Sequence, residues 1–402
     1  MRIAHRPVRR SRLARYAAGA LLLALVAAPA PAAQAQPQAQ PQAQPRTQPQ
    51  AAAGWQAVPP PTTAGLSSYV PFDASSAVAR SSVQTSFTCL PCEYEHTLWT
   101  RQAGTWRGLP LPPNDASTDV LTGTAPDDVW ALGRSVRGHF DQYHWNGSSW
   151  TDRSIPDFEV LAARSVARGE VWAVGNYREG VGDTRGAVAR WNGSAWTLTK
   201  LGTPGHWTNL KAVHVGSAND VWAVGSTGDD TSRPYAAHYD GTSWREVALP
   251  PVSSGLSASA NAVVARGGEV WIGGIDRNIW SDDGTGAPRA FALRREGTSW
   301  RVTYVPVLAP TGDEDTDRLS VQALAHHDGT LWAGLYADRA KDQGLARWNG
   351  SAWEPVAAPG TTRGSEVTAL YPTADGTLWA NGLVHPRAYL KGYAASLAPG
   401  AR

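Results

Sequence analysis

Hydrophobic and polar residues alternate in short runs along this chain, and one run returns at regular intervals. Residues 128–133 read Asp-Val-Trp-Ala-Leu-Gly, residues 170–175 read Glu-Val-Trp-Ala-Val-Gly, and residues 220–225 read Asp-Val-Trp-Ala-Val-Gly. A polar turn and a second tryptophan follow each run, as in Trp-Asn-Gly-Ser-Ser-Trp at 145–150. Looser copies centre on Trp271, Trp332 and Trp379. Self-similarity at a spacing of roughly 40 to 50 residues predicts a β-propeller, in which one repeat forms one blade.

Each repeat predicts four short strands. In the third copy, alternation at 210–215 indicates the innermost strand, and the runs at 220–225, 235–239 and 244–247 indicate the next three. Asp240 and the glycine after it suit a tight turn between the third and fourth strands, because both residues accept a positive φ. Proline-rich segments then end the pairing at the outer edge of the sheet. The sequence therefore predicts an all-β fold built from four-stranded blades.

The number of copies predicts seven blades. The first copy spans about residues 77–113, and the last spans 367–397. The last copy stops before a fourth strand, whereas residues 55–60 open with tryptophan and resemble the fourth strand at 353–356. We therefore expect an N-terminal strand to complete the last blade, which removes a free sheet edge. The predicted fold is a seven-bladed β-propeller over residues 55–398, closed by that strand.

Two sets of repeats resemble known propeller families. Residues 269–274, Glu-Val-Trp-Ile-Gly-Gly, followed by a turn and Trp300, resemble a kelch repeat. Residues 328–334, Asp-Gly-Thr-Leu-Trp-Ala-Gly, and the similar run at 375–379 resemble the propeller repeats of two-component sensor ectodomains. Most copies depart from kelch in having one glycine where kelch has a pair. The resemblance implies the propeller fold and leaves the function open, because propellers support many activities.

The N-terminus has the composition of an export signal. Several arginines precede an apolar run at 17–28, and Ala-Gln-Ala at 33–35 fits a cleavage site, so residues 1–35 are expected to be a secretory signal peptide. Residues 36–54 are rich in Gln, Pro and Ala and predict a disordered linker. Arg12 stands where a twin-arginine signal has Phe, which favours general secretion. We expect a secreted protein, extracellular or cell-wall-associated, with no transmembrane segment after cleavage.

Charge and cysteine content narrow the classes of partner. The net charge of +2 argues against a nucleic acid, and the preference for arginine over lysine is typical of a GC-rich bacterial genome of the actinobacterial type. Cys89 and Cys92 are the two cysteines, and export favours a local disulfide between them. A redox-active pair would need a strand-to-helix setting, and a zinc site would need four ligands. We predict no metal and no cofactor, and we expect a monomer.

Charged residues recur at fixed repeat positions on two neighbouring strands. The first position holds Asp128, Glu170, Asp220 and Glu269, and the second holds His144, Arg190, His238, Arg294 and Arg347. A ring of catalytic acids and bases is one interpretation, but catalysis needs unlike groups in one place. We therefore predict cross-strand charged pairs, one in each blade. The repeated tryptophans are predicted to pack between blades, and Asn146, Asn192 and Asn349 are predicted to form Asn-Gly turns, although each also fits a glycosylation sequon.

Candidate binding residues lie where the repeats differ. Loops between the second and third strands, and between one blade and the next, emerge on one face, which we call the loop face. The unrepeated side chains expected there are Tyr177, Trp207, Tyr235, Trp280, Tyr336, Arg277 and Asp282. Aromatic faces could stack on sugar rings while the charged groups bond hydroxyls. Solvated loops with some aromatic packing are the alternative interpretation.

Two classes of function are consistent with this pattern. The first is a secreted, non-catalytic binding propeller whose partner is an extracellular glycan or protein. The second is a secreted glycan-active enzyme, either a hydrolase in which carboxylates such as Asp282 and Asp313 meet across blades, or a lyase. Histidines outside the repeat could serve a metal or lyase site: His206, His326, His327 and His385. No catalytic constellation is evident, so we favour the binding propeller and assign no catalytic residue.

Overall fold

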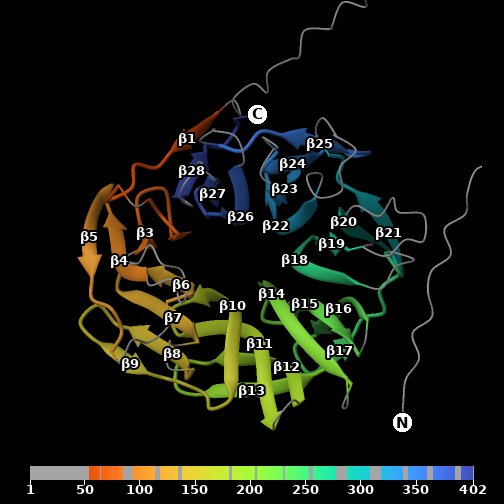
Figure 1. The fold of residues 1–402 in the computed structure, drawn as a ribbon, viewed down its shortest axis with the longest axis horizontal. Coiled ribbons are helices and arrows are strands. Elements are labelled where there is room, and N and C mark those ends of the chain that lie inside the picture. The colour runs from red at the N-terminus through yellow and green to blue at the C-terminus, as the bar shows by residue number, and fades with distance from the viewer. Residues whose placement is uncertain are drawn as a thin grey trace, which may run out of the picture. The chain divides into compact units, whose positions relative to one another are not determined.

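The computed structural model describes most of the chain beyond the predicted signal and linker. The described residues are 54–63, 65–84, 94–113, 118–134, 138–180, 183–203, 206–229, 231–252, 257–277, 288–307, 318–337, 343–359, 365–384 and 391–401. They form seven four-stranded antiparallel sheets arranged as the blades of a ring (Figure 1). Cys89, Cys92, Trp280 and Asp282 lie outside the described residues. Within the described ranges, no helix has the length and apolarity to cross a membrane.

The first four blades follow the chain from the inner to the outer strand. Blade 1 contains β2 (Ser68–Pro71), β3 (Ala77–Gln84), β4 (Tyr94–Gln102) and β5 (Thr105–Leu109). Blade 2 contains β6 (Val120–Ala125), β7 (Asp128–Arg134), β8 (Phe140–Trp145) and β9 (Trp150–Asp152). Blade 3 contains β10 (Phe158–Ala167), β11 (Glu170–Gly180), β12 (Asp183–Trp191) and β13 (Trp196–Leu201). Blade 4 contains β14 (Trp207–Ser217), β15 (Asp220–Gly228), β16 (Ser232–Tyr239) and β17 (Trp244–Glu246).

The remaining blades have the same order, and the last takes its outer strand from the other end of the chain. Blade 5 contains β18 (Ala258–Arg266), β19 (Glu269–Asp276), β20 (Arg289–Glu296) and β21 (Ser299–Tyr304). Blade 6 contains β22 (Leu319–His327), β23 (Thr330–Ala337), β24 (Leu345–Trp348) and β25 (Trp353–Val356). Blade 7 contains β26 (Ser365–Pro372), β27 (Leu378–Val384), β28 (Lys391–Leu397) and β1 (Trp55–Ala57).

The strand β1 closes the ring as predicted. It pairs with β28 in antiparallel register, with Trp55 opposite Leu397, and the amide of Val58 donates to the carbonyl of Ala394 at 2.9 Å. The indole of Trp55 packs edge-on against that of Trp332 in blade 6, with ring centroids 6.1 Å apart. The strand β1 therefore serves as the outer strand of blade 7 and joins the two ends of the propeller in one sheet.

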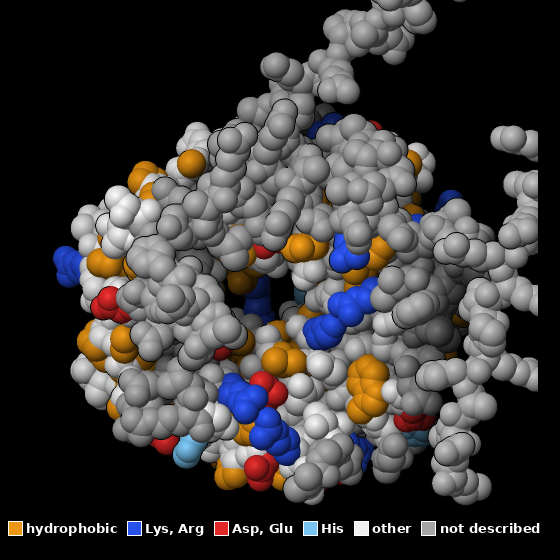
Figure 2. Space-filling model, viewed as in Figure 1, with side chains coloured by type: hydrophobic (Ala, Val, Ile, Leu, Met, Phe, Trp, Pro, Cys, Tyr) orange, Lys and Arg blue, Asp and Glu red, His pale blue; other side chains and the backbone are white. Residues whose placement is uncertain are grey.

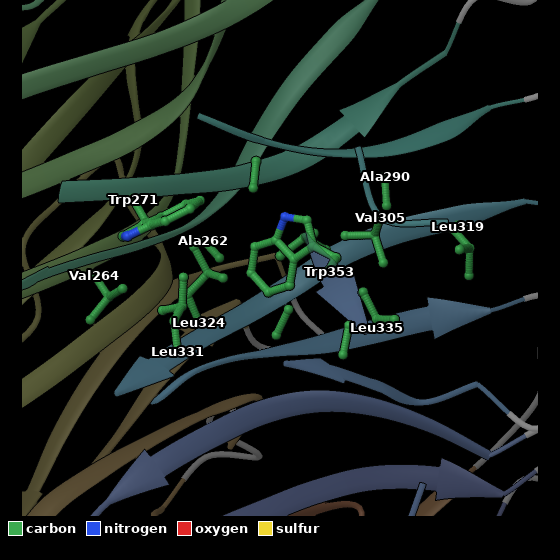
Figure 3. Packing of buried hydrophobic residues seen from close by; sticks show 14 of the residues in the cluster. Ala262, Val264, Trp271, Ala290, Val305, Leu319, Leu324, Leu331, Leu335 and Trp353 are labelled. Carbon is green, nitrogen blue, oxygen red and sulfur yellow. The ribbon is translucent and has the colours of Figure 1, made fainter. Parts of the chain in front are cut away.

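Tryptophans join each blade to the next, as the repeats predict. Trp271 of β19 meets Trp353 of β25 with ring centroids 5.7 Å apart and planes at 76°, inside a cluster of aliphatic side chains (Figure 3). The same contact between a second strand and the next blade's outer strand is made by Trp130 with Trp196, Trp172 with Trp244, and Trp222 with Trp300. Such edge-to-face pairs add roughly 0.5–1.5 kcal/mol each beyond the burial of their surface.

The predicted cross-strand charged pairs are confirmed in four blades. The carboxylates and bases meet as Asp128 with His144 (2.8 Å), Glu170 with Arg190 (2.8 Å), Asp220 with His238 (2.8 Å) and Glu269 with Arg294 (3.0 Å). In blade 6 the acidic position is occupied by Thr330, and Arg347 pairs with Glu354 of β25 at 2.9 Å instead. These groups therefore belong to the scaffold.

The predicted Asn-Gly turns are also confirmed. The side-chain Oδ1 atoms of Asn146, Asn192 and Asn349 each accept hydrogen bonds from the backbone amides two and three residues further on. The glycine after Asn192 has a φ of +94°, a conformation that side-chain-bearing residues rarely adopt. The turn geometry alone accounts for this recurring sequence.

Several strand boundaries differ from the prediction, among them those of β15 and β16, whose pairing continues to Gly228 and Ser232. Blade 1 begins earlier than residue 77, because β2 at Ser68–Pro71 pairs with β3 and forms its inner strand. In blade 4 the inner strand β14 starts at Trp207, well before residue 210, because its pairing with β15 continues to Gly228. Trp207 is therefore the first residue of an inner strand.

Candidate binding site in the central channel

The seven inner strands lie nearest the centre of the ring (Figure 1), and the space-filling view shows an opening there, which we call the central channel (Figure 2). These strands are β2, β6, β10, β14, β18, β22 and β26. Five of them carry a β-bulge at the same position, where one residue is skipped in the pairing with the second strand. The skipped residues differ from blade to blade: Leu161, Lys211, Asn261, Gln322 and Thr368. Because scaffold residues repeat, this variable position is a candidate for ligand contact.

Three of the bulge residues belong to one hydrogen-bonded chain across blades 4, 5 and 6. The ammonium Nζ of Lys211 donates to Ser259 Oγ at 2.8 Å and to Asn261 Oδ1 at 3.4 Å. The amide Nδ2 of Asn261 donates to Ser320 Oγ at 3.1 Å, and Nε2 of Gln322 donates to the same hydroxyl at 3.0 Å. The chain links three inner strands, and all of its polar partners are neutral.

Lys211 carries a positive charge that no described acid neutralises. Burial lowers the pKa of its ammonium, and the nearby positive charge of Arg277 lowers it further. The hydrogen-bond partners of its ammonium, Ser259 and Asn261, are both neutral. A partly buried cation without a counter-ion is costly to the fold. Such a group is more easily explained by a ligand than by the scaffold.

A second cation, Arg164, lies across the channel from blade 7. It is nearer the face at which the first strand of each blade turns into the second. The guanidinium of Arg164, on β10 of blade 3, lies 5.9 Å from the ring centroid of Tyr371, on β26 of blade 7. These blades are not neighbours, so the contact crosses the channel. Burial lowers the pKa of Arg164 and raises that of Tyr371, although both side chains retain some accessible surface. Among the described residues, Arg164 has no ion-pair partner.

Positive charge therefore collects around the channel. Figure 2 shows Lys and Arg side chains close to the central opening. His214 of β14 adds a polar group there, since its Nε2 lies 2.9 Å from the carbonyl of Ala265 in blade 5. Burial, together with the charge of Arg164, lowers the pKa of His214 to about 4, so the imidazole is neutral at pH 7.

Trp207, Arg277 and Tyr336 from the predicted site lie near this chain of polar groups. Trp207 lies on the same strand as Lys211, is partly exposed, and donates from Nε1 to the carbonyl of Asp229 at 2.9 Å. Arg277 is exposed, and its amide donates to the carbonyl of Ser257 at 2.8 Å, just before β18. Tyr336 is 37% exposed and lies opposite Ser320 in the register of β23 with β22.

Tyr235 and Tyr177 are placed differently. Tyr235 is 3% exposed within the core between blades 3 and 4, and its hydroxyl accepts a hydrogen bond from the amide of Gly202 at 3.1 Å. Burial raises the pKa of Tyr235 to about 12. Tyr177 packs against the core between blades 2 and 3, and the ammonium of Lys200 lies 4.1 Å from its ring centroid. The candidate site therefore contains neither of these two residues.

The unrepeated histidines do not converge. His206 Nδ1 lies 2.7 Å from a carboxylate oxygen of Asp229, while His327 is buried beside Asp328. Burial lowers the pKa of His326. His385 and Asp313 lie outside the described residues. Across the part of the chain that the structure describes, no three His, Cys, Asp or Glu side chains gather in a way that could hold a metal ion.

Comparison with known proteins identifies the class of fold. No protein-family model matches the chain, and no curated protein matches it. The structure of YCF48 bound to D1 peptide matches with a TM-score of 0.52 and 13% identity, covering 87% of this chain and 99% of that one. The propeller domain of the Trilobed protease from Pyrococcus furiosus matches with a TM-score of 0.51 and 9% identity, covering 83% and 92%.

An enzyme of the same fold also matches. The oligogalacturonate lyase in complex with manganese has a TM-score of 0.51 and 12% identity, covering 86% of this chain and 93% of that one. Identities this low show the fold alone, and the neighbours include both enzymes and proteins not described as enzymes. The chain is a seven-bladed β-propeller.

Proposed function

We propose that the chain is a secreted, non-catalytic binding propeller with kelch-like or sensor-like repeats. Its ligand is an extracellular glycan or protein segment that reaches the central channel from the loop face. Each inner strand starts at the loop face, so Trp207 lies at the channel mouth while Lys211 lies further in. A ligand that enters here meets an aromatic side chain first and a cation next.

One observation carries this proposal. The acids and bases that recur in blades 2 to 5 are paired, whereas Lys211 and Arg164, which occur once each, have no acidic partner among the described residues. A scaffold gains nothing from a desolvated, unpaired cation. Polar groups that converge on a concavity and retain unused donors are the usual property of a binding site.

The test is a screen of the purified mature domain, residues 36–402, on glycan and peptide arrays, with the mass of soluble polysaccharide followed in parallel. We expect retention of one ligand class without loss of mass, and loss of retention in Trp207→Ala with little change in melting temperature. Loss of polysaccharide mass would replace the binding function with the glycan-active enzyme. A folded domain that retains no probe on either array would overturn the proposal.

A further inference from the structure

We propose that Lys211 and Gln322 form a carboxylate-binding site inside the channel, and that the ligand is an acidic glycan whose uronic-acid group occupies it. This inference rests on the proposed binding function and names the class of its ligand. Two hydrogen-bond donors remain unused in the chain of polar groups that links β14, β18 and β22.

The first unused donor belongs to Lys211. A lysine ammonium has three N–H donors, and two of them point to Ser259 Oγ and Asn261 Oδ1. Ser259 Oγ donates in turn to Asn261 Oδ1 at 3.1 Å, so both acceptors are held in place. The third N–H has no partner among the described residues, and no described acid neutralises the charge. The ammonium is thus fixed on one side and open on the other.

The second unused donor belongs to Gln322. Its Nε2 donates one hydrogen to Ser320 Oγ at 3.0 Å, and the other hydrogen has no partner among the described residues. Ser320 is also the acceptor for Asn261 Nδ2, which orders its hydroxyl from both sides. Gln322 and Lys211 are therefore oriented by the same framework, although they lie on strands of blades 6 and 4.

A carboxylate matches this pair of donors. The match is in charge and in number: a carboxylate has one negative charge and two acceptor oxygens, and the site offers one ammonium and one amide hydrogen. A phosphate or sulfate ester has three terminal oxygens and is usually held by a guanidinium fork or several backbone amides. The exposed side chain of Arg277 adds favourable charge near Lys211 without entering the hydrogen-bonded chain.

Trp207 favours a sugar over a peptide as the carrier of that carboxylate. Its indole is partly exposed and is absent from the hydrophobic clusters that hold the repeated tryptophans between blades. The bond from Nε1 to the Asp229 carbonyl fixes the ring plane, which is the preorganisation that stacking on a flat sugar face needs. Four strand positions separate Trp207 from Lys211, about 13 Å at roughly 3.3 Å per residue, which a short oligosaccharide can span.

The experiment measures binding of uronic-acid oligomers to the mature domain by calorimetry. Trimers of galacturonic and glucuronic acid are compared with their methyl esters, which keep the shape and lose the charge. We expect the acids to bind and the esters to bind at least about tenfold more weakly, since the ester has no charge to pair with the ammonium. Acid binding should also weaken as salt is raised from low ionic strength.

Lysine variants on the same face supply the matched control. Lys211→Met should lower affinity for the acids at least about tenfold and change the melting temperature little, because the loss of two hydrogen bonds is offset by removal of a desolvated charge without an acidic partner. Lys200→Met removes a lysine that is paired with Glu179 at 2.7 Å and should leave affinity unchanged. Gln322→Met should cause a smaller loss, because it removes a neutral donor. Melting curves of all variants confirm that each is folded.

The possible failures are distinguishable. Equal binding of acids and esters, or unchanged affinity in Lys211→Met, would overturn the carboxylate site while the binding function stands. Retention of acidic peptides but not uronic acids, dependent on Lys211, would overturn the glycan assignment and make a protein the partner. If no glycan or peptide is retained by the folded domain, the proposed function fails and the carboxylate site fails with it.

Discussion

Two cations on third strands of this propeller are paired with acids, whereas two cations on inner strands have no acidic partner among the described residues. Arg190 and Arg294 on third strands each face a carboxylate of the adjacent strand, at 2.8 and 3.0 Å, and recur at the same repeat position. Lys211 and Arg164 on inner strands occur once each, and their described neighbours are hydroxyls, amides and a phenol ring. The first group is explained by the fold alone. The second group is not.

This difference separates architecture from function within one chain. A repeated fold needs the same contacts in every blade, so a group that all blades share stabilises the ring. A group present in a single blade, desolvated and unpaired, lowers the stability of the fold unless a ligand completes its interactions. The comparison predicts that removing shared contacts destabilises the protein, whereas removing the channel cations changes binding and leaves stability almost unchanged.

The largest effect is expected from opening the ring. Deleting residues 55–60 removes β1, the contact of Trp55 with Trp332, and the hydrogen bond of Val58 to Ala394. Trp55→Ala alone should lower the free energy of unfolding by about 1–3 kcal/mol, because its indole is partly buried, and the deletion should lower it further because β28 becomes an open edge. Urea denaturation measures both values.

Trp55→Phe is the control, because it keeps an aromatic ring against Trp332 and should recover most of the stability. A deletion variant that unfolds at the same urea concentration as the full domain would show that β1 does not hold the ring closed. It would also contradict the prediction that removing contacts shared by the blades destabilises the protein.

The sequence predicts most of this architecture for the same reason that the architecture is stable. Most blades repeat their tryptophans, four repeat the acid–base pair and three repeat the Asn-Gly turn, so the same pattern can be recognised in several copies. The inner strand of blade 1 is missed because Ser68–Pro71 carries no repeated residue, and Tyr69 is buried against neighbouring aromatics that lie far away in the sequence. Strand ends are missed where pairing extends into unrepeated residues such as Trp207.

The channel site is harder to predict because its defining property is a relation between distant residues. Lys211 is separated from Ser259 by 48 positions and from Asn261 by 50, and the sequence does not show that its charge lacks a partner. In the sequence it reads as one polar residue of an alternating inner strand. Tyr235 illustrates the converse, since it resembles a loop aromatic in the sequence but packs into the core, where its hydroxyl is bonded to Gly202. The bulge position shared by five inner strands becomes visible only in the pairing register.

The next-largest effect is expected in the pH dependence of the free energy of unfolding, and it comes from His214 in the channel. Burial and the charge of Arg164 lower the pKa of His214 from an ordinary 6.5 to about 4 in the folded protein. Between these values the unfolded chain binds a proton that the folded protein does not, so stability falls as the pH falls from 6.5 to 4, by up to about 3 kcal/mol. His214→Gln keeps a donor for the Ala265 carbonyl and should remove that dependence.

The measurement is urea denaturation of both proteins at pH 7 and pH 4.5. The two should be similar at pH 7, and the variant should be about 2 kcal/mol more stable at pH 4.5. If both proteins lose the same stability on acidification, the pKa of His214 is not lowered in the folded protein. Groups near it would then compensate the positive charge of the channel.

The smallest effect is the most direct test of the comparison, because it exchanges one arginine of each kind for methionine, which keeps most of the length and apolar surface. Arg190→Met removes the pair with Glu170 at 2.8 Å and the cation above the Trp172 ring at 5.0 Å, and it should cost about 0.5–1 kcal/mol. Arg164→Met breaks no ion pair, so its free energy of unfolding should stay within about 0.5 kcal/mol of the parent or rise. Urea denaturation at pH 7 checks both.

A loss above about 2 kcal/mol in Arg164→Met would assign Arg164 to the scaffold, since bridging to Tyr371 would then hold blades 3 and 7 in place. An unchanged stability, accompanied by a higher pKa of His214, would show that the channel keeps this charge at no benefit to the fold.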